Sequence, residues 1–451
     1  MFILGEGLLI YLAVFFASTF GMDRDLELST LFILVWMKVL LITVVCQLSL
    51  YFHDLYDFKS TENLVDLYTR LIQAIGVTSI ILAAIYFIVP GAIVGRWIFF
   101  ISIVFLLFLL VSWRLLYAFI VKKKLFTERA IVLGAGDLAG DILNEIKDRK
   151  DVGYNIRCIV GHESERNGRP DRSGIAIRYG FEDLCDFAEA EQVSDIIVAL
   201  DEKRGLMPCA QLLNCKVRGI SIIDGESFFE RISGKLLVEK LTPSWLIFSE
   251  GFAKSNFSRL TKRLCGFALS SVMLIILSPL LLVTVLAIKL DSRGAVLFSQ
   301  ERVGENEKII RIYKFRSMVA DAEEYTGPVW AEENDPRVTR VGRIIRKLRV
   351  DELPQLWNVL KGDMSFVGPR PERPFFVEKL KQTIPYYKER FSVKPGVTGW
   401  AQIKYPYGAT EKDALEKLKY DLYYIKNMSF LMDFMIVFQT MKIVLLSRGS
   451  R

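Results

Sequence analysis

Apolar residues fill most of the first 120 or so positions of the chain, in four long runs separated by short polar segments. The runs cover 3–20, 31–52, 71–89 and 97–121. Each approaches the roughly 20 residues that a helix needs to cross a bilayer. A basic triplet at 122–124 marks the cytoplasmic side, and four spans then place the N-terminus there too, with the acid-rich loop 23–27 outside. We therefore predict four transmembrane helices in residues 1–124; a buried all-helical core is the alternative.

Between residues 125 and 240, short apolar runs alternate with helical patterns, which predicts a Rossmann-like domain with a doubly wound parallel sheet. A strand at 130–133 leads into Gly134-Ala-Gly136-Asp-Leu-Ala139, a turn that opens a helix and could admit a pyrophosphate. The nearest acidic candidate for a ribose contact, Glu163, comes late after the second strand. A structural or regulatory module is therefore favoured over a bound dinucleotide.

A fifth apolar run, at 264–288, follows a linker at 241–261 and has basic residues at both ends. A straight span would export everything that follows it. Ser278-Pro279 near its middle favours another form, because proline removes a helix hydrogen bond and the serine hydroxyl can satisfy a group freed by the break. Since the flanking basic residues favour the cytoplasmic surface at both ends, we predict a re-entrant helix over 262–290, bent at Ser278 and Pro279.

Composition narrows the possible functions. Hydrophobic residues make up 52% of the 451 residues, which is more than a soluble enzyme usually carries. The net charge of +7 suits anionic headgroups or phosphorylated substrates; nucleic acid is disfavoured because the chain also carries membrane segments. With only two histidines, acid-base or nucleophilic chemistry falls to carboxylates. None of the six cysteines forms a CxxC pair, so we expect free thiols in a reducing compartment.

The candidate chemistry lies in residues 291–451, where the adjacent acids Asp351 and Glu352 follow a run of arginines. Carboxylates can hold a metal or attack phosphorus, while arginines neutralise phosphate oxygens. Asp351 stands at the N-cap of a helix predicted over 352–361, and the positive helix end, with Arg346 and Arg349, should keep both acids ionised. The alternative is that Asp351 only caps the helix.

Three further segments add to this picture. Lys314 and Arg316 follow a strand-like run at 309–313 and could flank a phosphate. Pro369-Arg370-Pro371 fixes a guanidinium in a rigid turn that could shape a nucleotide pocket, although such turns are often only turns. The apolar segment 430–446 is expected either to lie in the membrane interface or to pack in a core.

Together, KFRSM, DPRVTRVGRIIRKLRVDELPQLWNVLKGDMSFVGPRP and VKPGVTGWAQI resemble the bacterial sugar transferase family. Within it, the chain is similar to the large polyprenyl-phosphate glycosyl-1-phosphate transferases of the monotopic phosphoglycosyltransferase type. The resemblance covers about 257–451, and four membrane helices before a Rossmann-like domain also match the large members. The segment PSWLIFSEGF resembles a subgroup found with exopolysaccharide and exosortase systems. One departure is Gly294-Ala295, where members often have Gly-Pro.

The resemblance implies transfer of a sugar 1-phosphate from a UDP-sugar to undecaprenyl phosphate with release of UMP, which initiates exopolysaccharide or O-antigen-type glycan synthesis. Asp351 would attack the sugar-linked phosphate and form a covalent aspartyl phosphosugar. Mg²⁺ would be bound by Glu352, with Asp351 beside it. The implied substrate contacts are Lys314, Arg316, Arg346 and Arg349 with phosphates, and Pro369, Arg370 and Pro371 with uridine.

The fold class expected from all of this is a membrane protein of α plus α/β type: four transmembrane helices, a Rossmann-like domain, and a mostly helical catalytic domain with a re-entrant helix. The resemblance implies a multi-pass protein of the bacterial inner membrane, in contact with lipid, with its catalytic domain in the cytoplasm. Formation of a homo-oligomer is an open option. Open alternatives are a membrane-anchored nucleotide-sensing regulator, a scaffold for polysaccharide assembly, and a one-step reaction in which Asp351 acts as a base.

Overall fold

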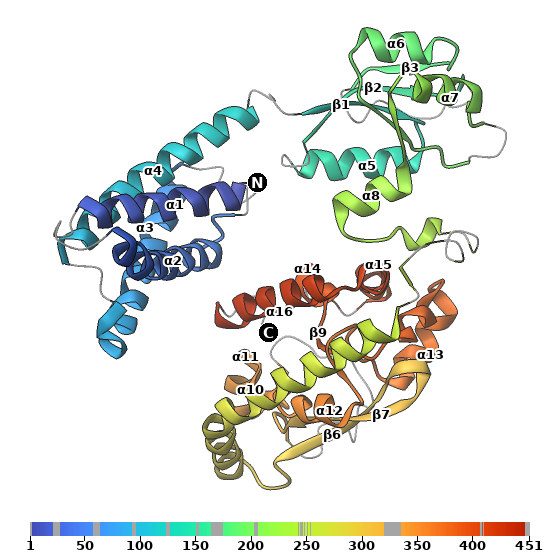
Figure 1. Cartoon of the computed structure of the whole chain (residues 1–451). Helices are drawn as coiled ribbons and strands as arrows, with labels where there is room; N and C mark the ends of the chain where they lie inside the picture. The colour runs from blue at the N-terminus through green and yellow to red at the C-terminus, as the bar shows by residue number, and fades with distance from the viewer. Residues whose placement is uncertain are drawn as a thin grey trace. The chain divides into compact units, whose positions relative to one another are not determined.

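The computed structural model describes residues 2–20, 28–56, 64–92, 96–122, 127–149, 153–163, 175–202, 206–319, 335–405, 408 and 410–446, apart from seven positions between 242 and 253. These residues form two units, Met1–Gly225 and Glu226–Arg451 (Figure 1).

The first unit begins with a helix at each of the four apolar runs, as predicted: α1 (Phe2–Phe20), α2 (Leu28–Phe52), α3 (Leu64–Ile88) and α4 (Arg96–Lys122), with a short turn η1 (Pro90–Ala92) after α3. α1 packs on α2 and α4, and α2 packs on α3. A buried ion pair joins Glu6 of α1 to Arg114 of α4 at 2.7 Å. The loop 23–27 and residues 123–124, which set the predicted orientation, lie outside the described residues.

Within the described residues, two helical segments are long and apolar enough to cross a membrane: Asp66–Ile88 in α3 and Asn256–Asp291. Ile3–Ser18, Trp36–Phe52 and Ile103–Tyr117 are shorter apolar helices. The four-span topology therefore stays a prediction.

A parallel five-stranded sheet follows, in the order β3-β2-β1-β4-β5, which confirms the predicted parallel sheet. Its elements are β1 (Glu128–Leu133), α5 (Asp137–Asp148), β2 (Tyr154–Gly161), β3 (Ile177–Tyr179), α6 (Leu184–Ala190), β4 (Asp195–Val198), α7 (Cys209–Val217) and β5 (Ser221–Asp224). The apolar residues of β1 and β4 are fully buried, which explains why they read as unbroken hydrophobic runs.

The glycine turn between β1 and α5 is filled by the chain itself. A Cβ on Gly134 would lie 2.5 Å from the carbonyl oxygen of Ala199, and one on Gly136 would lie 1.9 Å from Oδ2 of Asp201. The Asp201 carboxylate accepts hydrogen bonds from the N–H groups of Asp137 at 2.6 Å and Leu138 at 3.0 Å. A carboxylate thus occupies the helix N-terminus where a pyrophosphate could have bound, which favours the structural interpretation of this turn.

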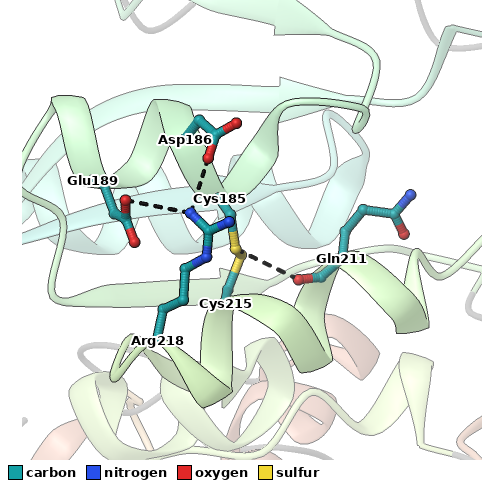
Figure 2. The surroundings of a disulfide bond; sticks show 6 residues. All are labelled: Cys185, Asp186, Glu189, Gln211, Cys215 and Arg218. Carbon is teal, nitrogen blue, oxygen red and sulfur yellow. Dashed lines mark hydrogen bonds and ion pairs between the residues drawn. A yellow bond between two sulfur atoms is a disulfide. The ribbon is translucent and has the colours of Figure 1, made fainter.

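A disulfide joins Cys185 of α6 to Cys215 of α7, and Figure 2 shows its surroundings. Beside it, Arg218 binds Asp186 at 2.8 Å and Glu189 at 3.3 Å, which also ties the two helices together. The expectation of six free thiols is therefore wrong for this pair. The two cysteines are 30 positions apart in the chain, and the packing of α6 on α7 brings their Cα atoms to 5.2 Å.

The second unit is mostly helical. It contains α8 (Gly225–Ser233), η3 (Val238–Lys240), α10 (Asn256–Asp291), β6 (Leu297–Val303), η4 (Glu305–Glu307), β7 (Ile309–Phe315), α11 (Arg340–Lys347), η5 (Val350–Glu352), α12 (Gln355–Lys361), β8 (Ser365–Val367), α13 (Pro374–Thr383), η6 (Tyr387–Ser392), β9 (Gly396–Thr398), α14 (Trp400–Lys404), α15 (Glu411–Asn427) and α16 (Phe430–Leu445). β6 pairs with β7 in antiparallel fashion, and β8 pairs with β9 in parallel.

The boundary between the two compact units lies between Gly225 and Glu226. Leu236 and Val238 are buried in the same core as Leu418 and Leu422 of α15. The N–H of Leu236 donates to the carbonyl of Lys419 at 3.1 Å. Residues 226–240 therefore belong with the second unit and not with the parallel sheet.

α10 contains the predicted break. Pro279 has no N–H to donate to the carbonyl of Ile275, and the hydroxyl of Ser278 donates to that carbonyl instead, at 2.8 Å. The predicted role of the serine is thus confirmed, and Figure 1 shows α10 changing direction along its length. Before the bend, Gly266 faces Val359; beyond it, Ile288 packs in a cluster with Phe315. Apolar side chains near the bend are exposed.

Candidate active site

The acid pair lies in the short turn η5, which connects α11 to α12. The prediction that Asp351 is the N-cap of the following helix is wrong. α12 begins at Gln355, and Pro354 is its N-cap. The reason is a left-handed residue, Arg349 (φ 55°), which ends the run from α11 and is followed by a 3-10 turn. The predicted helix end is correct, since Gly362 (φ 96°) is the C-cap of α12.

Glu352 is held by two cations that come from distant parts of the chain. Its Oε1 accepts a hydrogen bond from Nζ of Lys314, which lies near the end of β7, at 2.9 Å. The same oxygen accepts a hydrogen bond from Nη2 of Arg370, which lies in the turn after β8, at 2.6 Å. The Glu352 side chain is only 13% exposed. Burial alone would raise the pKa of Glu352, but Arg370 and Lys314 outweigh it and hold this pKa well below its usual range. Glu352 is therefore an ionised, fixed carboxylate.

Asp351 is in a different electrostatic state. Among the described residues, no hydrogen bond or ion pair holds its carboxylate. Burial and the neighbouring Glu352 charge raise the pKa of Asp351 to about 6, against the opposing effect of Lys314, Arg346 and Arg370. The nearby cations favour the ionised form of Asp351, as expected, but desolvation is the larger effect and raises the pKa. The carboxylate is still mostly ionised at neutral pH and is free to react.

A buried asparagine, which sequence reasoning missed, fixes the helix behind the acid pair. Asn358 of α12 accepts from the N–H of Tyr313 at 3.1 Å and donates to the carbonyl of Arg311 at 2.7 Å. These two bonds lock α12 to β7 immediately before Lys314. The available signal was a polar residue within the apolar stretch LPQLWNVL, a position that calls for a specific partner.

Of the other arginines predicted to contact substrate, some lie beside the acid pair and one lies at the end of α10. Arg346, at the end of α11, acts electrostatically on Asp351, and Arg349 forms the left-handed residue before η5. Arg316 is buried and donates through Nη2 to the carbonyl and hydroxyl oxygens of Ser292, at 2.8 and 2.9 Å. Because Ser292 is the C-cap of α10, Arg316 neutralises the end of that helix, and it is Lys314 that reaches Glu352.

A divalent metal fits this donor set in a limited way. The described residues contain no group of three or more His, Cys, Asp or Glu side chains that could hold a metal ion. Mg²⁺ commonly takes one or two carboxylates and completes its shell with water and substrate phosphates, so three protein ligands are unnecessary. Since Lys314 and Arg370 both contact Oε1 of Glu352, its Oε2 and the Asp351 carboxylate are the oxygens that can face a metal.

The arrangement therefore combines one fixed carboxylate, one free and mostly ionised carboxylate, and several cations. An ionised carboxylate is a competent nucleophile toward an electrophilic centre, and fixed cations stabilise the charge of an anionic substrate or transition state.

Two family models match the sequence. One, described as bacterial sugar transferase, matches residues 257–447, which include all of the acid pair's partners. The other, described as a CoA-binding domain, matches residues 51–206.

Several curated proteins are similar to this chain. It is 41% identical over 240 residues to the UDP-N-acetylgalactosamine-undecaprenyl-phosphate N-acetylgalactosaminephosphotransferase of Aeromonas hydrophila, covering 53% of this chain and 56% of that protein. It is 33% identical over 329 residues to the undecaprenyl-phosphate glucose phosphotransferase of Komagataeibacter xylinus, covering 71% and 60%. It is 45% identical over 185 residues to the exopolysaccharide production protein PSS of Rhizobium leguminosarum bv. phaseoli, covering 39% and 90%. The chain thus spans less than two thirds of the first two relatives.

Proposed function

Because this chain belongs to the bacterial sugar transferase family, we propose that it transfers a sugar 1-phosphate from a UDP-sugar to undecaprenyl phosphate and releases UMP. The names of the relatives from Aeromonas and Komagataeibacter describe phosphotransfer to the same lipid. The observation that carries the proposal is the contrast within the acid pair: Glu352 is fixed between Lys314 and Arg370, whereas Asp351 beside it is unrestrained among the described residues.

In the first step, a carboxylate oxygen of Asp351 attacks the sugar-linked phosphorus of the donor. A new O–P bond forms, the bond from this phosphorus to the bridging oxygen breaks, and UMP leaves with that oxygen. The high charge of the diphosphate is neutralised by Arg346 and by the cations that surround Glu352. The free Asp351 carboxylate suits this role because it needs no general base once it is ionised.

In the second step, a phosphate oxygen of undecaprenyl phosphate attacks the same phosphorus. The bond to Asp351 breaks, the carboxylate is regenerated, and the diphosphate-linked sugar lipid leaves. The acceptor enters after UMP has gone. One set of cations can therefore neutralise first the diphosphate of the donor and then the diphosphate of the lipid product. In the one-step alternative, Asp351 acts as a base that removes a proton from the lipid phosphate. A carboxylate whose pKa is about 6 would contribute little in this role, because the lipid phosphate is already ionised near neutral pH.

Mg²⁺ is the cofactor that this site suits, and Glu352 and Asp351 are the residues that would hold it. When bound, it would neutralise diphosphate oxygens and help UMP to leave. Glu352 is prepared for such a role because Arg370 and Lys314 keep it ionised at any pH near neutral.

The acceptor is a membrane lipid, and the bend in α10 supports a catalytic unit anchored on one face of the membrane. A helix that enters and leaves by the same side keeps the acid pair in the cytoplasm, where UDP-sugars are made. The multi-pass topology of α1–α4 in the bacterial inner membrane, and a role in exopolysaccharide or O-antigen-type synthesis, belong to this proposal.

The test is UMP release from a panel of UDP-sugars with undecaprenyl phosphate and Mg²⁺, for wild type and Asp351→Ala. We expect release with at least one donor, and its loss in the variant and with EDTA. Lipid-dependent release that survives Asp351→Ala would place the nucleophile elsewhere. No release by correctly folded wild type would favour the sensor or scaffold function.

A further inference from the structure

The Pro369-Arg370-Pro371 turn is anchored through its carbonyl oxygens. Two of its three residues are prolines, which have no N–H to donate, so the turn can be fixed mainly as an acceptor. Each of the three carbonyls accepts a hydrogen bond from a different segment: Pro369 from the N–H of Gly396 at 2.9 Å, Arg370 from Nη2 of Arg390 at 3.1 Å, and Pro371 from Nη1 of Arg302 at 3.0 Å.

The middle anchor, Arg390, is the most deeply buried cation of this group. It lies in η6 with 5% of its side chain exposed, and its Nη2 also binds Oδ2 of Asp421 at 2.7 Å. Its Nη1 donates to the hydroxyl of Tyr387 at 2.5 Å. Asp421, on α15, is 2% exposed. A planar guanidinium can serve these partners in fixed directions, whereas an ammonium at the same place cannot.

The residue that Arg390 anchors is the one that holds Glu352. Arg370 offers its carbonyl to Arg390 and its guanidinium to Glu352, so a continuous series of contacts runs from Asp421 through Arg390 and Arg370 to Glu352. A small cavity is lined by the three residues of the turn together with Arg390, Phe391 and Pro395.

We propose that Arg390, oriented by Asp421, is a positioning residue for the transfer reaction: it fixes the backbone of Arg370 and thereby the place of the Arg370 guanidinium on Glu352. This inference rests on the proposed function. Arg390 touches no substrate in this account. Its effect reaches the reacting atoms through Arg370, and a small displacement of a charge-stabilising group is enough to slow catalysis strongly.

The test compares Arg390→Lys with Lys388→Gln, a control in the same short helix whose side chain is 70% exposed. We measure kcat and KM for the UDP-sugar, and thermal unfolding. We expect Arg390→Lys to lose about ten- to a hundredfold in kcat with KM changed less than about threefold. Lys388→Gln should match wild type in each measurement.

A purely structural role predicts a different result, namely activity lost only in proportion to the loss of folded protein. That result, or wild-type kcat in folded Arg390→Lys, would overturn the proposal. If Arg390→Lys does not fold, Asp421→Asn carries the same test, because it keeps the shape of Asp421 and removes only its charge. We expect a smaller fall in kcat, again with KM nearly unchanged. No UMP release by folded wild type would instead contradict the proposed function, and this role with it.

Discussion

Asp351 and Glu352 are consecutive residues whose pKa values are shifted in opposite directions. The pKa of Glu352 is held well below its usual range, and that of Asp351 is raised to about 6. The cause is that Lys314 and Arg370 bind Glu352 directly, while Asp351 lies half-buried beside the negative charge of Glu352. Two neighbouring acids with separated pKa values can take separate roles, one as a fixed charge and one as the reactive group.

The pH dependence of UMP release should report the ionisation of Asp351. We expect kcat/KM to be constant near neutral pH and to fall about tenfold per pH unit below the Asp351 pKa of about 6, because only the carboxylate attacks phosphorus. Arg346 lowers this pKa, so Arg346→Gln should move the acidic limb to higher pH, and Arg346→Lys should leave it near the wild-type position. A limb that stays in place in Arg346→Gln would show that another group titrates.

The free energy of unfolding should rise when the Asp351 charge is removed. A folded-state pKa near 6, above the usual 3.8, means that the native protein binds a proton more readily than the unfolded chain, so stability falls as pH rises from about 4 through 6. Asp351→Asn should therefore be inactive but more stable at pH 7, by roughly 1–2 kcal/mol.

Thermal unfolding of wild type and Asp351→Asn as a function of pH checks this. The difference between the two proteins should shrink as the pH falls from about 6 toward about 3, below which the wild-type carboxyl is protonated in both states. A stabilisation that is independent of pH would have a cause other than the buried charge.

Asn358 should contribute to stability far more than an average surface residue. Asn358→Ala leaves the N–H of Tyr313 and the carbonyl of Arg311 without their partner, which we expect to cost about 2–4 kcal/mol in the free energy of unfolding. Lys361→Ala, at an exposed position of the same helix, should change it by less than about 0.5 kcal/mol. Equal unfolding curves for the two variants would show that α12 does not depend on these bonds.

The bend in α10 should decide the side on which the catalytic unit lies. Pro279→Ala removes the break and permits one straight helix of 36 residues, about 54 Å long, which exceeds the roughly 30 Å of a bilayer core. A C-terminal reporter should be cytoplasmic in wild type and partly exported in Pro279→Ala. Ser278→Ala, which leaves the Ile275 carbonyl without its donor, should keep the wild-type topology at lower stability. An external reporter in wild type would contradict the re-entrant path.

Local patterns predicted most of the elements. The four apolar helices, the parallel sheet after the glycine turn, and the Ser278-Pro279 break all depend on residues close together in the chain, and the structure has each of them. The start of α12 was predicted too early because an acidic residue before a proline is compatible with both an N-cap and a 3-10 turn.

Contacts between distant segments could not be predicted in the same way. Nothing near Arg316 indicates that its partner is Ser292, and nothing near Cys185 indicates Cys215. The raised pKa of Asp351 likewise depends on burial, which the surrounding arginines do not reveal in the sequence. The acid pair itself could be identified because its two residues are adjacent.

The most direct test of the account is mass spectrometry of the protein after incubation with the UDP-sugar donor and Mg²⁺, without undecaprenyl phosphate. We predict release of UMP and the addition of one sugar phosphate to the peptide that contains Asp351, absent in Asp351→Ala and removed when the lipid acceptor is added. UMP release that begins only with the acceptor, with no adduct on this peptide, would contradict the covalent role of Asp351.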